Sequence, residues 1–390
     1  MPVINRLAGQ SGELAQWRQH LHTRPELLFD VTETAAFVAG KLKEFGCDDV
    51  VTGIGRSGVV GVINGSRQAP GAGPVIGLRA DMDALPIREE TGKPYASRID
   101  GKMHACGHDG HTTMLLGAAR YLAETRNFAG KAVVVFQPAE EGGTGAQEML
   151  AAGLMDQFGI EEIYGLHNWP GLPVGQFAIR PGPIMGISNQ LRIELTGRGG
   201  HAAMPAGCID TVMVGSQIVT ALQTIVSRNV EPVDAAVVSI ATFQAGDSFN
   251  VLPERAMLSG TCRALRIEVL DFLERRVKET AETIARLHGA KAEVTITRDS
   301  PATVNSPRQF EHALSVAEEV AGPGRVDRDC RPSMATEDFG FMLEARPGAF
   351  IFLGNGDSAG LHHPRYDFDD GAIPYGASWL ARLVEQRSAG

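Results

Sequence analysis

Residues of the types that bind divalent metal ions recur in this chain directly after apolar, strand-like runs or just before a helical pattern. Because ligands in α/β sheets collect beyond the carboxyl ends of parallel strands, these residues are predicted to meet at one edge of a sheet. Thiolate, imidazole and carboxylate together suit a zinc-like divalent ion, and a further carboxylate beside them suits a general base. The candidates are Cys106, His108, the pair Glu140 and Glu141, His167 and His362.

Cys106 and His108 stand two residues apart in the run Met103–His111, before an amphipathic helix. As ligands they must be a deprotonated thiol and a neutral imidazole, states that a bound divalent cation itself enforces. The alternative is a buried cysteine beside a histidine that caps a helix. His104 and His111 flank the pair. A tight loop cannot aim every side chain at one ion, so we expect these two to orient the ligands or to pack around them.

Glu140 and Glu141 follow the apolar run 133–136. Successive side chains at a strand end point in opposite directions, so one carboxylate can bind metal while the other reaches a water molecule. A cation lowers the pKa of a bound water, and a neighbouring carboxylate takes its proton as it attacks a carbonyl. The alternative is a pair of surface glutamates.

Asp81 and Asp83 end another apolar run, 75–80, and are predicted to hydrogen-bond imidazole ligands and fix their tautomers. Either could instead cap a helix. His201 closes the glycine-rich turn Gly197–His201 and is either a substrate contact or an ordinary surface histidine.

Composition narrows the class of protein. The chain has 390 residues, 43% hydrophobic and 21% charged, which is enough for two domains with apolar cores. Its formal charge of −10 and the lack of Lys/Arg-rich runs argue against nucleic acid and favour a small-molecule substrate. Five widely spaced cysteines form no disulfide framework. There is no apolar signal core and no membrane-length apolar segment, so we expect a cytoplasmic protein with no membrane partner.

The pattern of elements predicts an α/β fold. Residues 1–183 alternate helices with continuous apolar strands, which indicates a mostly parallel, buried sheet. Residues 184–298 change rhythm to β-α-β-β-α-β, the order of a ferredoxin-like α+β unit. We therefore predict a discontinuous catalytic domain, 1–183 and 299–390, with an inserted domain at 184–298. Asp30 and Glu33 also resemble a capping box at a helix start.

Six strings resemble the hippurate hydrolase and auxin-conjugate (indole-acetyl-amino acid) hydrolase branch of the dinuclear-metal aminoacylase/carboxypeptidase family. The resemblance covers the whole chain, in order. It implies a two-metal amidohydrolase whose catalytic domain is interrupted by a smaller dimerisation or lid domain. The strings are Arg79–Pro86, Met103–His111, Gln137–Gly143, Gly200–Ala202, Phe249–Glu254 and Leu361–Phe368.

Position by position, the resemblance implies Glu140 as general base and His201 as a lid histidine that helps to bind substrate from the partner subunit. Asn250 falls on a lid position near substrate, and Arg263 on one that meets the substrate carboxylate in some relatives. Relatives often carry a small polar residue where this chain has His363, so the choice between His362 and His363 as ligand stays open. The implied metal ligands are Cys106, His108, Glu141, His167 and His362.

These observations predict a homodimeric hydrolase that cleaves N-acyl amino acids, such as hippurate-like, N-acetyl or indole-acetyl conjugates, into carboxylate and amino acid. Two divalent cations per subunit are expected, with Zn, Co or Ni favoured by the soft Cys106 and Mn by the resemblance. One alternative is a metal-dependent dipeptidase or carboxypeptidase of the same family. Another is a metal-free thiol amidase with Cys106 as nucleophile and His108 or His111 as base. A non-catalytic relative is disfavoured because every ligand position and Glu140 are occupied.

Overall fold

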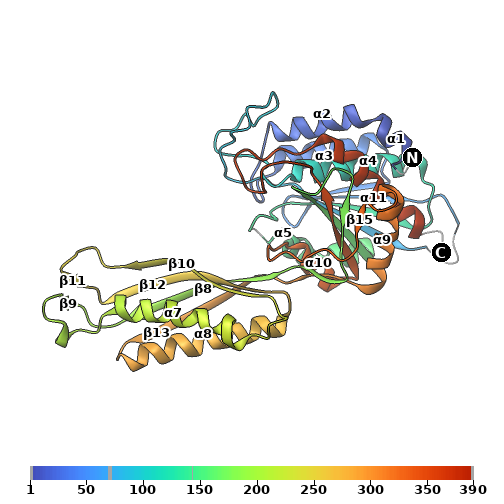
Figure 1. Cartoon of the computed structure of the whole chain (residues 1–390). Coiled ribbons are helices and arrows are strands. Elements are labelled where there is room, and N and C mark those ends of the chain that lie inside the picture. The colour runs from blue at the N-terminus through green and yellow to red at the C-terminus, as the bar shows by residue number, and fades with distance from the viewer. Residues whose placement is uncertain (1–2, 69–72, 143, 388–390) are drawn as a thin grey trace. The chain divides into compact units, whose positions relative to one another are not determined.

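The computed structural model describes residues 3–68, 73–142 and 144–387. Gly143, the last residue of the Gln137–Gly143 string, lies outside the described residues. The chain forms two units, shown in Figure 1. Unit 1 comprises Met1–Ile184, Val304–Arg331 and Asp338–Gly390, and unit 2 comprises Met185–Thr303 and Pro332–Glu337. Among the described residues, no helix has the length and apolar character that crossing a membrane requires.

The main sheet of unit 1 has eight strands, and its four central strands run parallel. The predicted mostly parallel α/β sheet is thus confirmed, with antiparallel pairs only toward its edges. The strand order is β1 (Asp49–Ile54), β2 (Gly58–Asn64), β4 (Lys131–Gln137), β3 (Val75–Asp81), β5 (Glu162–Trp169), β16 (Gly348–Gly354), β6 (Phe177–Ala178) and β15 (Val326–Asp327).

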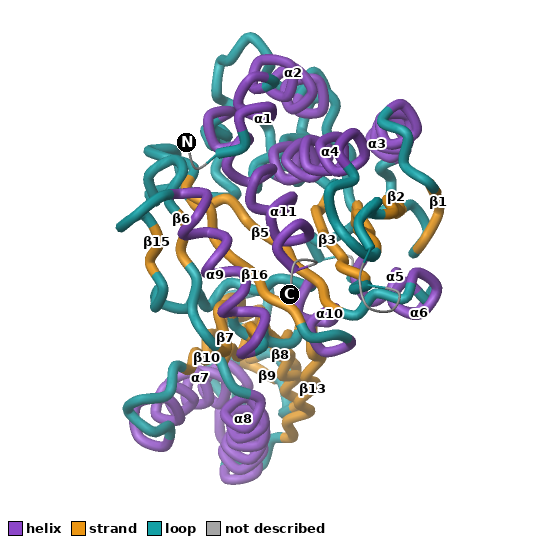
Figure 2. Tube along the Cα trace, turned by 90° about the vertical axis from the view of Figure 1, so that its right-hand side faces the viewer, coloured by secondary structure: helices purple, strands orange, loops and turns teal. Residues whose placement is uncertain are grey.

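Helices bury both faces of this sheet, which is why its central strands are apolar throughout. Four helices pack against one another over one face: α2 (Ser11–His22), α4 (His108–Thr125), α9 (Pro307–Ala321) and α11 (Ile373–Arg387) (Figure 2). Alternate residues of β16 face the other way, where Phe350 meets Phe339 of α10. The remaining elements of this unit are α1 (Asn5–Gly9), α3 (Thr32–Glu44), α5 (Gly145–Ala151), α6 (Leu154–Phe158), α10 (Phe339–Ala345) and η2 (Asp370–Ala372).

The register of the parallel strands aligns their carboxyl ends. Asp81 of β3 pairs with Gln137 of β4, and His167 of β5 pairs with Phe352 of β16. The residues that follow each strand therefore emerge at one edge of the sheet, as the sequence pattern predicts.

Unit 2 follows the predicted β-α-β-β-α-β order, and its strands form an antiparallel sheet in the order β10–β12–β8–β13. Both helices pack on one face, where Leu191, Ile193 and Leu195 of β8 meet apolar residues of the helices. The elements in chain order are β8 (Ile187–Thr196), α7 (Thr211–Asn229), β10 (Ala236–Ala245), β12 (Arg255–Ala264), α8 (Ile267–Leu287) and β13 (Lys291–Ser300).

Three short elements complete unit 2: β9 (Gly200–His201), η1 (Pro205–Gly207) and β11 (Val251–Leu252), with β9 and β11 paired. The separate ribbon of β7 (Gly182–Met185) and β14 (Thr303–Asn305) lies where the chain passes from one unit to the other in sequence. Residues Pro332–Glu337, which the sequence analysis left in the catalytic domain, belong to unit 2: Ser333 bridges to Met185, and the Gly186 amide donates to the Ala335 carbonyl at 3.0 Å.

Candidate metal centre

Five side chains from four separate stretches of unit 1 converge beyond the carboxyl ends of the strands. The Cys106 Sγ lies 3.3 Å from Nε2 of His167. Glu141 Oε1 lies 3.1 Å from Nε2 of His362 and 4.0 Å from Nε2 of His108. Three overlapping groups each offer ligand atoms within 4.8 Å of one another: Cys106 with His108 and His167, Cys106 with Glu141 and His362, and His108 with Glu140 and Glu141.

Several of these atoms are buried and make no hydrogen bond among the described residues. They include both ring nitrogens of His108 and Oε1 of Glu141, which have neighbours at ion-pair distance but make no hydrogen bond. Buried polar atoms without a hydrogen bond are costly, so these atoms fit bound cations better than they fit one another. Two of the three-residue groups share Cys106, an arrangement suited to two neighbouring ions. Sulfur, nitrogen and oxygen donors together suit borderline divalent metals.

The loop that carries Cys106 is fixed by Asn168, which follows His167 on β5. The side-chain amide of Asn168 donates to the Cys106 carbonyl at 2.6 Å, and the Tyr366 hydroxyl donates to the side-chain oxygen of Asn168 at 2.7 Å. Gly107, at φ 89°, must be glycine because a Cβ there would lie 2.4 Å from both Asn168 Nδ2 and Tyr366 Oη. Asn168 and Tyr366, both distant from Cys106 in sequence, thus help to hold Cys106 beside His167.

Asp81 and Asp83 are buried beside the histidines. Asp81 pairs with His111 Nδ1 at 2.7 Å and accepts from Arg79 at 2.8 Å. Asp83 lies 3.5 Å from His108 Nδ1 and accepts the backbone N–H groups of Glu140 and Glu141 at 3.0 and 3.1 Å. The first carboxylate therefore orients His111, which is not a predicted ligand, and lies 3.7 Å from Nε2 of the predicted ligand His108. The second also fixes the loop that carries both glutamates.

The two adjacent histidines have different surroundings. His362 takes the left-handed conformation at φ 62°, its N–H donates to the Ala105 carbonyl at 2.8 Å, and its ring faces Glu141. The ring nitrogen Nδ1 of His363 instead accepts the Arg365 N–H at 3.0 Å. This geometry favours His362 over His363 as a ligand.

The charged groups of the site favour the binding of a positively charged ion. Burial, and then the carboxylates of Glu141 and Glu140, raise the pKa of the Cys106 thiol well above its ordinary value. Burial opposes ionisation of His108, yet Asp81, Asp83 and Glu141 outweigh it and raise its pKa to about 10. A bound divalent cation would reverse both shifts, because it favours the thiolate and the neutral imidazole.

The remaining predicted residues lie in unit 2. His201 of β9 pairs with Val251 of β11, and the Ala202 amide donates to the Asn250 carbonyl at 3.0 Å, so His201 and Asn250 are close together. Arg263 lies near the C-terminal end of β12, where its guanidinium donates to the Met334 carbonyl at 2.8 Å. The eight residue steps along the strand from Arg255 to Arg263 span roughly 26 Å. Arg263 is therefore far from the N-terminal end of β12, which follows β11 in the chain.

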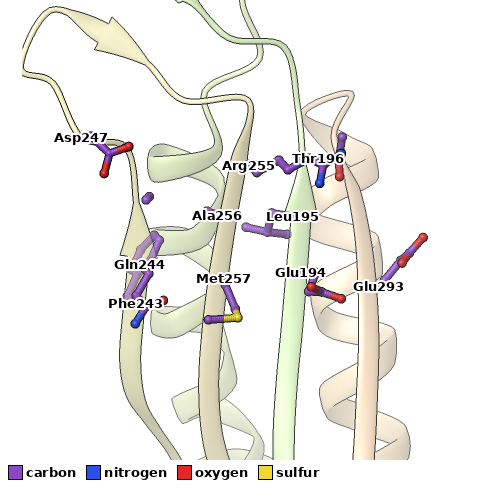
Figure 3. A pocket seen from close by; sticks show the side chains of 12 residues that line it. Glu194, Leu195, Thr196, Phe243, Gln244, Asp247, Arg255, Ala256, Met257 and Glu293 are labelled. Carbon is purple, nitrogen blue, oxygen red and sulfur yellow. The ribbon is translucent and has the colours of Figure 1, made fainter.

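A recess of about 910 Å³ lies on the face of the unit 2 sheet opposite its helices (Figure 3). Met257, Glu194 and Glu293 stand opposite one another there on neighbouring strands. None of the predicted site residues lines this recess.

The sequence analysis did not single out Arg79, Gln137, Asn168, Asp338 or Tyr366. All of them are buried and hydrogen-bonded around the centre. A signal exists for the first two, since Arg79 and Gln137 are polar residues directly after the apolar runs of β3 and β4.

Comparisons with known proteins agree with this geometry. The model of peptidase family M20/M25/M40 matches residues 77–386. Hippurate hydrolase of Campylobacter jejuni is 41% identical over 384 residues, which cover 98% of this chain and 99% of the relative. The IAA-amino acid hydrolase ILR1-like 5 of Arabidopsis thaliana is 38% identical over 377 residues, covering 94% and 85% of the two chains.

A solved structure from Bacillus subtilis, described as a dinuclear metal binding peptidase from the M20 family, superposes with a TM-score of 0.85. It is 33% identical, and the match covers 98% of this chain and 99% of that one. This chain belongs to peptidase family M20/M25/M40 and is a hydrolase that acts on amide bonds. The family resemblance seen in the sequence is therefore confirmed. The relative and the ligand groups above also support two divalent metal ions as its cofactors.

Proposed function

We propose that this protein hydrolyses the amide bond of N-acyl amino acids, releasing a carboxylate and an amino acid, with two divalent metal ions per subunit. The observation that carries the proposal is the convergence of five possible ligands, Cys106, His108, Glu141, His167 and His362. Their ligand atoms include buried atoms of His108 and Glu141 that make no hydrogen bond among the described residues. The curated relatives named above, a hippurate hydrolase and an auxin-conjugate hydrolase, support the substrate class.

Those five residues would hold the ions, Mn, Zn, Co or Ni. When bound, the ions supply Lewis-acid polarisation of the amide carbonyl and a lowered pKa for the attacking water. Glu140, beside the ligand Glu141, takes the proton of that water and returns it to the leaving nitrogen. Asp81 and Asp83 keep the imidazoles oriented through the contacts described above.

Substrate contacts come from unit 2 in this proposal. His201 stabilises the oxyanion, Asn250 lies near the acyl group or the amide, and Arg263 binds the carboxylate of the amino acid. Within one chain, His201 pairs with β11, just before the start of β12, whereas Arg263 lies near the C-terminal end of β12. The distance between these two ends of β12 is longer than an N-acyl amino acid. One substrate can meet both only if two copies contribute. We therefore propose a homodimer in which His201 acts in the partner's site.

We further propose a cytoplasmic location, which the five free thiols support, since a reducing compartment keeps cysteines unpaired. A dipeptidase or carboxypeptidase of the same family remains the second candidate. Its substrate carries an aminoacyl or peptidyl group on the scissile nitrogen, where the N-acyl amino acids proposed here carry a benzoyl, acetyl or indole-acetyl group.

Metal removal and a substrate screen test the proposal together. Chelation should abolish activity, and Mn, Co, Ni or Zn should restore it. Benzoyl, acetyl and indole-acetyl amino acids should be cleaved faster than dipeptides with a free amine. A metal-free preparation with full activity would establish the thiol amidase instead, and faster cleavage of dipeptides would establish the peptidase.

A further inference from the structure

The loop that carries Glu140 and Glu141 is held by two buried carboxylates. Asp83 accepts the backbone N–H groups in the middle of the loop. Asp338 holds both of its ends: it accepts from the Gln137 side chain, at the end of β4, at 2.7 and 2.9 Å, and from the Ala146 N–H, at the start of α5, at 2.9 Å. The Asp338 side chain is 3% exposed.

Asp338 also joins this loop to Asp81. Arg79 donates to Asp338 at 3.2 Å, to Gln137 at 2.9 Å and to Asp81 at 2.8 Å. A carboxylate has only acceptors, so Asp338 can receive all of these donors at once. An asparagine would turn one of its own N–H groups toward a donor. The network therefore needs the aspartate and not merely a side chain of its size.

We propose that Asp338 is a positioning residue for the metal centre, and that it couples the Glu140–Glu141 loop to the segment that contacts Arg263. The proposal rests on the function proposed above. Asp338 lies outside the three ligand groups described above, and its carboxylate comes within 4.8 Å of those of Glu140 and Glu337. In this proposal it acts through Gln137 and Arg79.

The coupling follows from what precedes Asp338 in the chain. Residues Pro332–Glu337 belong to unit 2, and the carbonyl of Met334 accepts the Arg263 guanidinium at 2.8 Å. Met334 is four residues before Asp338. A substrate carboxylate that draws Arg263 toward itself competes with this hydrogen bond. The segment must then adjust. It is held at Ala335 by the Gly186 N–H, and Asp338 is the first residue after it that contacts the network of the Glu140–Glu141 loop.

Two variants and one control test the positioning role. Asp338→Asn and Gln137→Met each remove part of the network. The control is Glu162→Gln, because Glu162 is also a buried acid with glutamine and arginine partners, Gln309 and Arg387, but stands at the opposite end of β5 from the site. Metal affinity is measured by competition with a metal-binding dye, and loop order by amide hydrogen exchange of residues 139–142 and 144–146 in metal-free protein.

Both network variants should bind metal roughly 10 to 100-fold more weakly and exchange faster in residues 139–142 and 144–146, as expected when a group that orients a ligand is lost. For a substrate that is cleaved, kcat should fall in both variants because the catalytic loop is disturbed, and KM should stay within about twofold in Gln137→Met, which leaves Asp338 and the segment before it in place. The control should change neither metal affinity nor loop exchange. Wild-type affinity and loop protection in either folded network variant would overturn the positioning role. If Asp338→Asn does not fold, Gln137→Met decides.

A double-mutant cycle tests the coupling. Arg263→Gln and Asp338→Asn should lose less kcat/KM together than the product of their separate losses, because each disturbs the same path. Losses that multiply within about twofold would overturn the coupling. Metal affinity and hydrogen exchange need no substrate, so a wild-type protein that cleaves no N-acyl amino acid would end the proposed function and still leave the positioning role tested.

Discussion

Glu140 and Glu141 are neighbours whose backbone amides share one acceptor, Asp83, yet their side chains face different partners. Glu141 contacts His362 and approaches His108, whereas Glu140 shares a group of possible ligand atoms with His108 and Glu141. In the proposed function, Glu141 is a metal ligand and Glu140 is the general base. The difference makes their substitutions distinguishable.

Glu140→Gln should retain bound metal and lose roughly two to four orders of magnitude in kcat, because an amide cannot accept the proton of water. Glu141→Gln should instead weaken metal binding, because a charged ligand is lost. Metal content by atomic spectroscopy and steady-state kinetics check both. Metal loss in Glu140→Gln, with metal and activity retained in Glu141→Gln, would reverse the two roles.

At the scale of elements, α2 and α4 are joined by a buried ion pair close to the metal loop. His22, the last residue of α2, lies 2.8 Å from Asp109 in the first turn of α4, with Glu89 at 3.4 Å and Arg18 also beside Asp109. Burial lowers the pKa of His22, but Asp109 and Glu89 outweigh it and raise that pKa from 6.5 to about 9. The positive charge of His22 therefore stabilises the folded unit.

This pair predicts a stability that depends on pH. A folded pKa above the unfolded one gives stabilisation that is complete below about pH 6.5 and is lost as pH rises through about 9. This shift in the pKa of His22 corresponds to at most about 3 kcal/mol of folding stability. Urea unfolding of metal-free protein at pH 6 and 9.5 should show wild type losing its advantage over His22→Asn at the higher pH. An advantage that is the same at both pH values would contradict the assignment.

The sequence predicted the elements because helix and strand periodicity is local, and it placed Asp81, Glu140 and His167 at strand ends for the same reason. Contacts between residues that are distant in sequence could not be predicted from such local patterns. The capping box predicted at Asp30 and Glu33 is wrong: α3 begins later, and Glu26 accepts the N–H groups of Glu33 and Thr34 at 3.0 and 2.8 Å. In the same way Asp338, 201 residues after Gln137, could not be linked to it by any local pattern.

At the scale of the whole molecule, the separation of His201 from Arg263 makes the proposed dimer testable by complementation. Mixed dimers of Glu140→Gln and His201→Ala subunits would contain one site lacking both groups and one with both intact. Random mixing makes half the dimers mixed, so about a quarter of wild-type activity should return. Co-purification of differently tagged subunits must show exchange first. Complete exchange without recovered activity would mean that His201 does not act in the partner's site.

The parallel pairing of β5 with β16 joins residues 162–169 to residues 348–354, with unit 2 encoded between them. During synthesis, β3, β4 and β5 leave the ribosome with the edge of β5 uncovered, while residues 185–303 of unit 2 can already fold as one continuous stretch. The central sheet closes only when β16 emerges, followed by His362 and α11. We therefore expect nascent chains to expose an apolar strand edge for much of translation, and ribosomes stalled before Gly348 to yield aggregating, metal-free products.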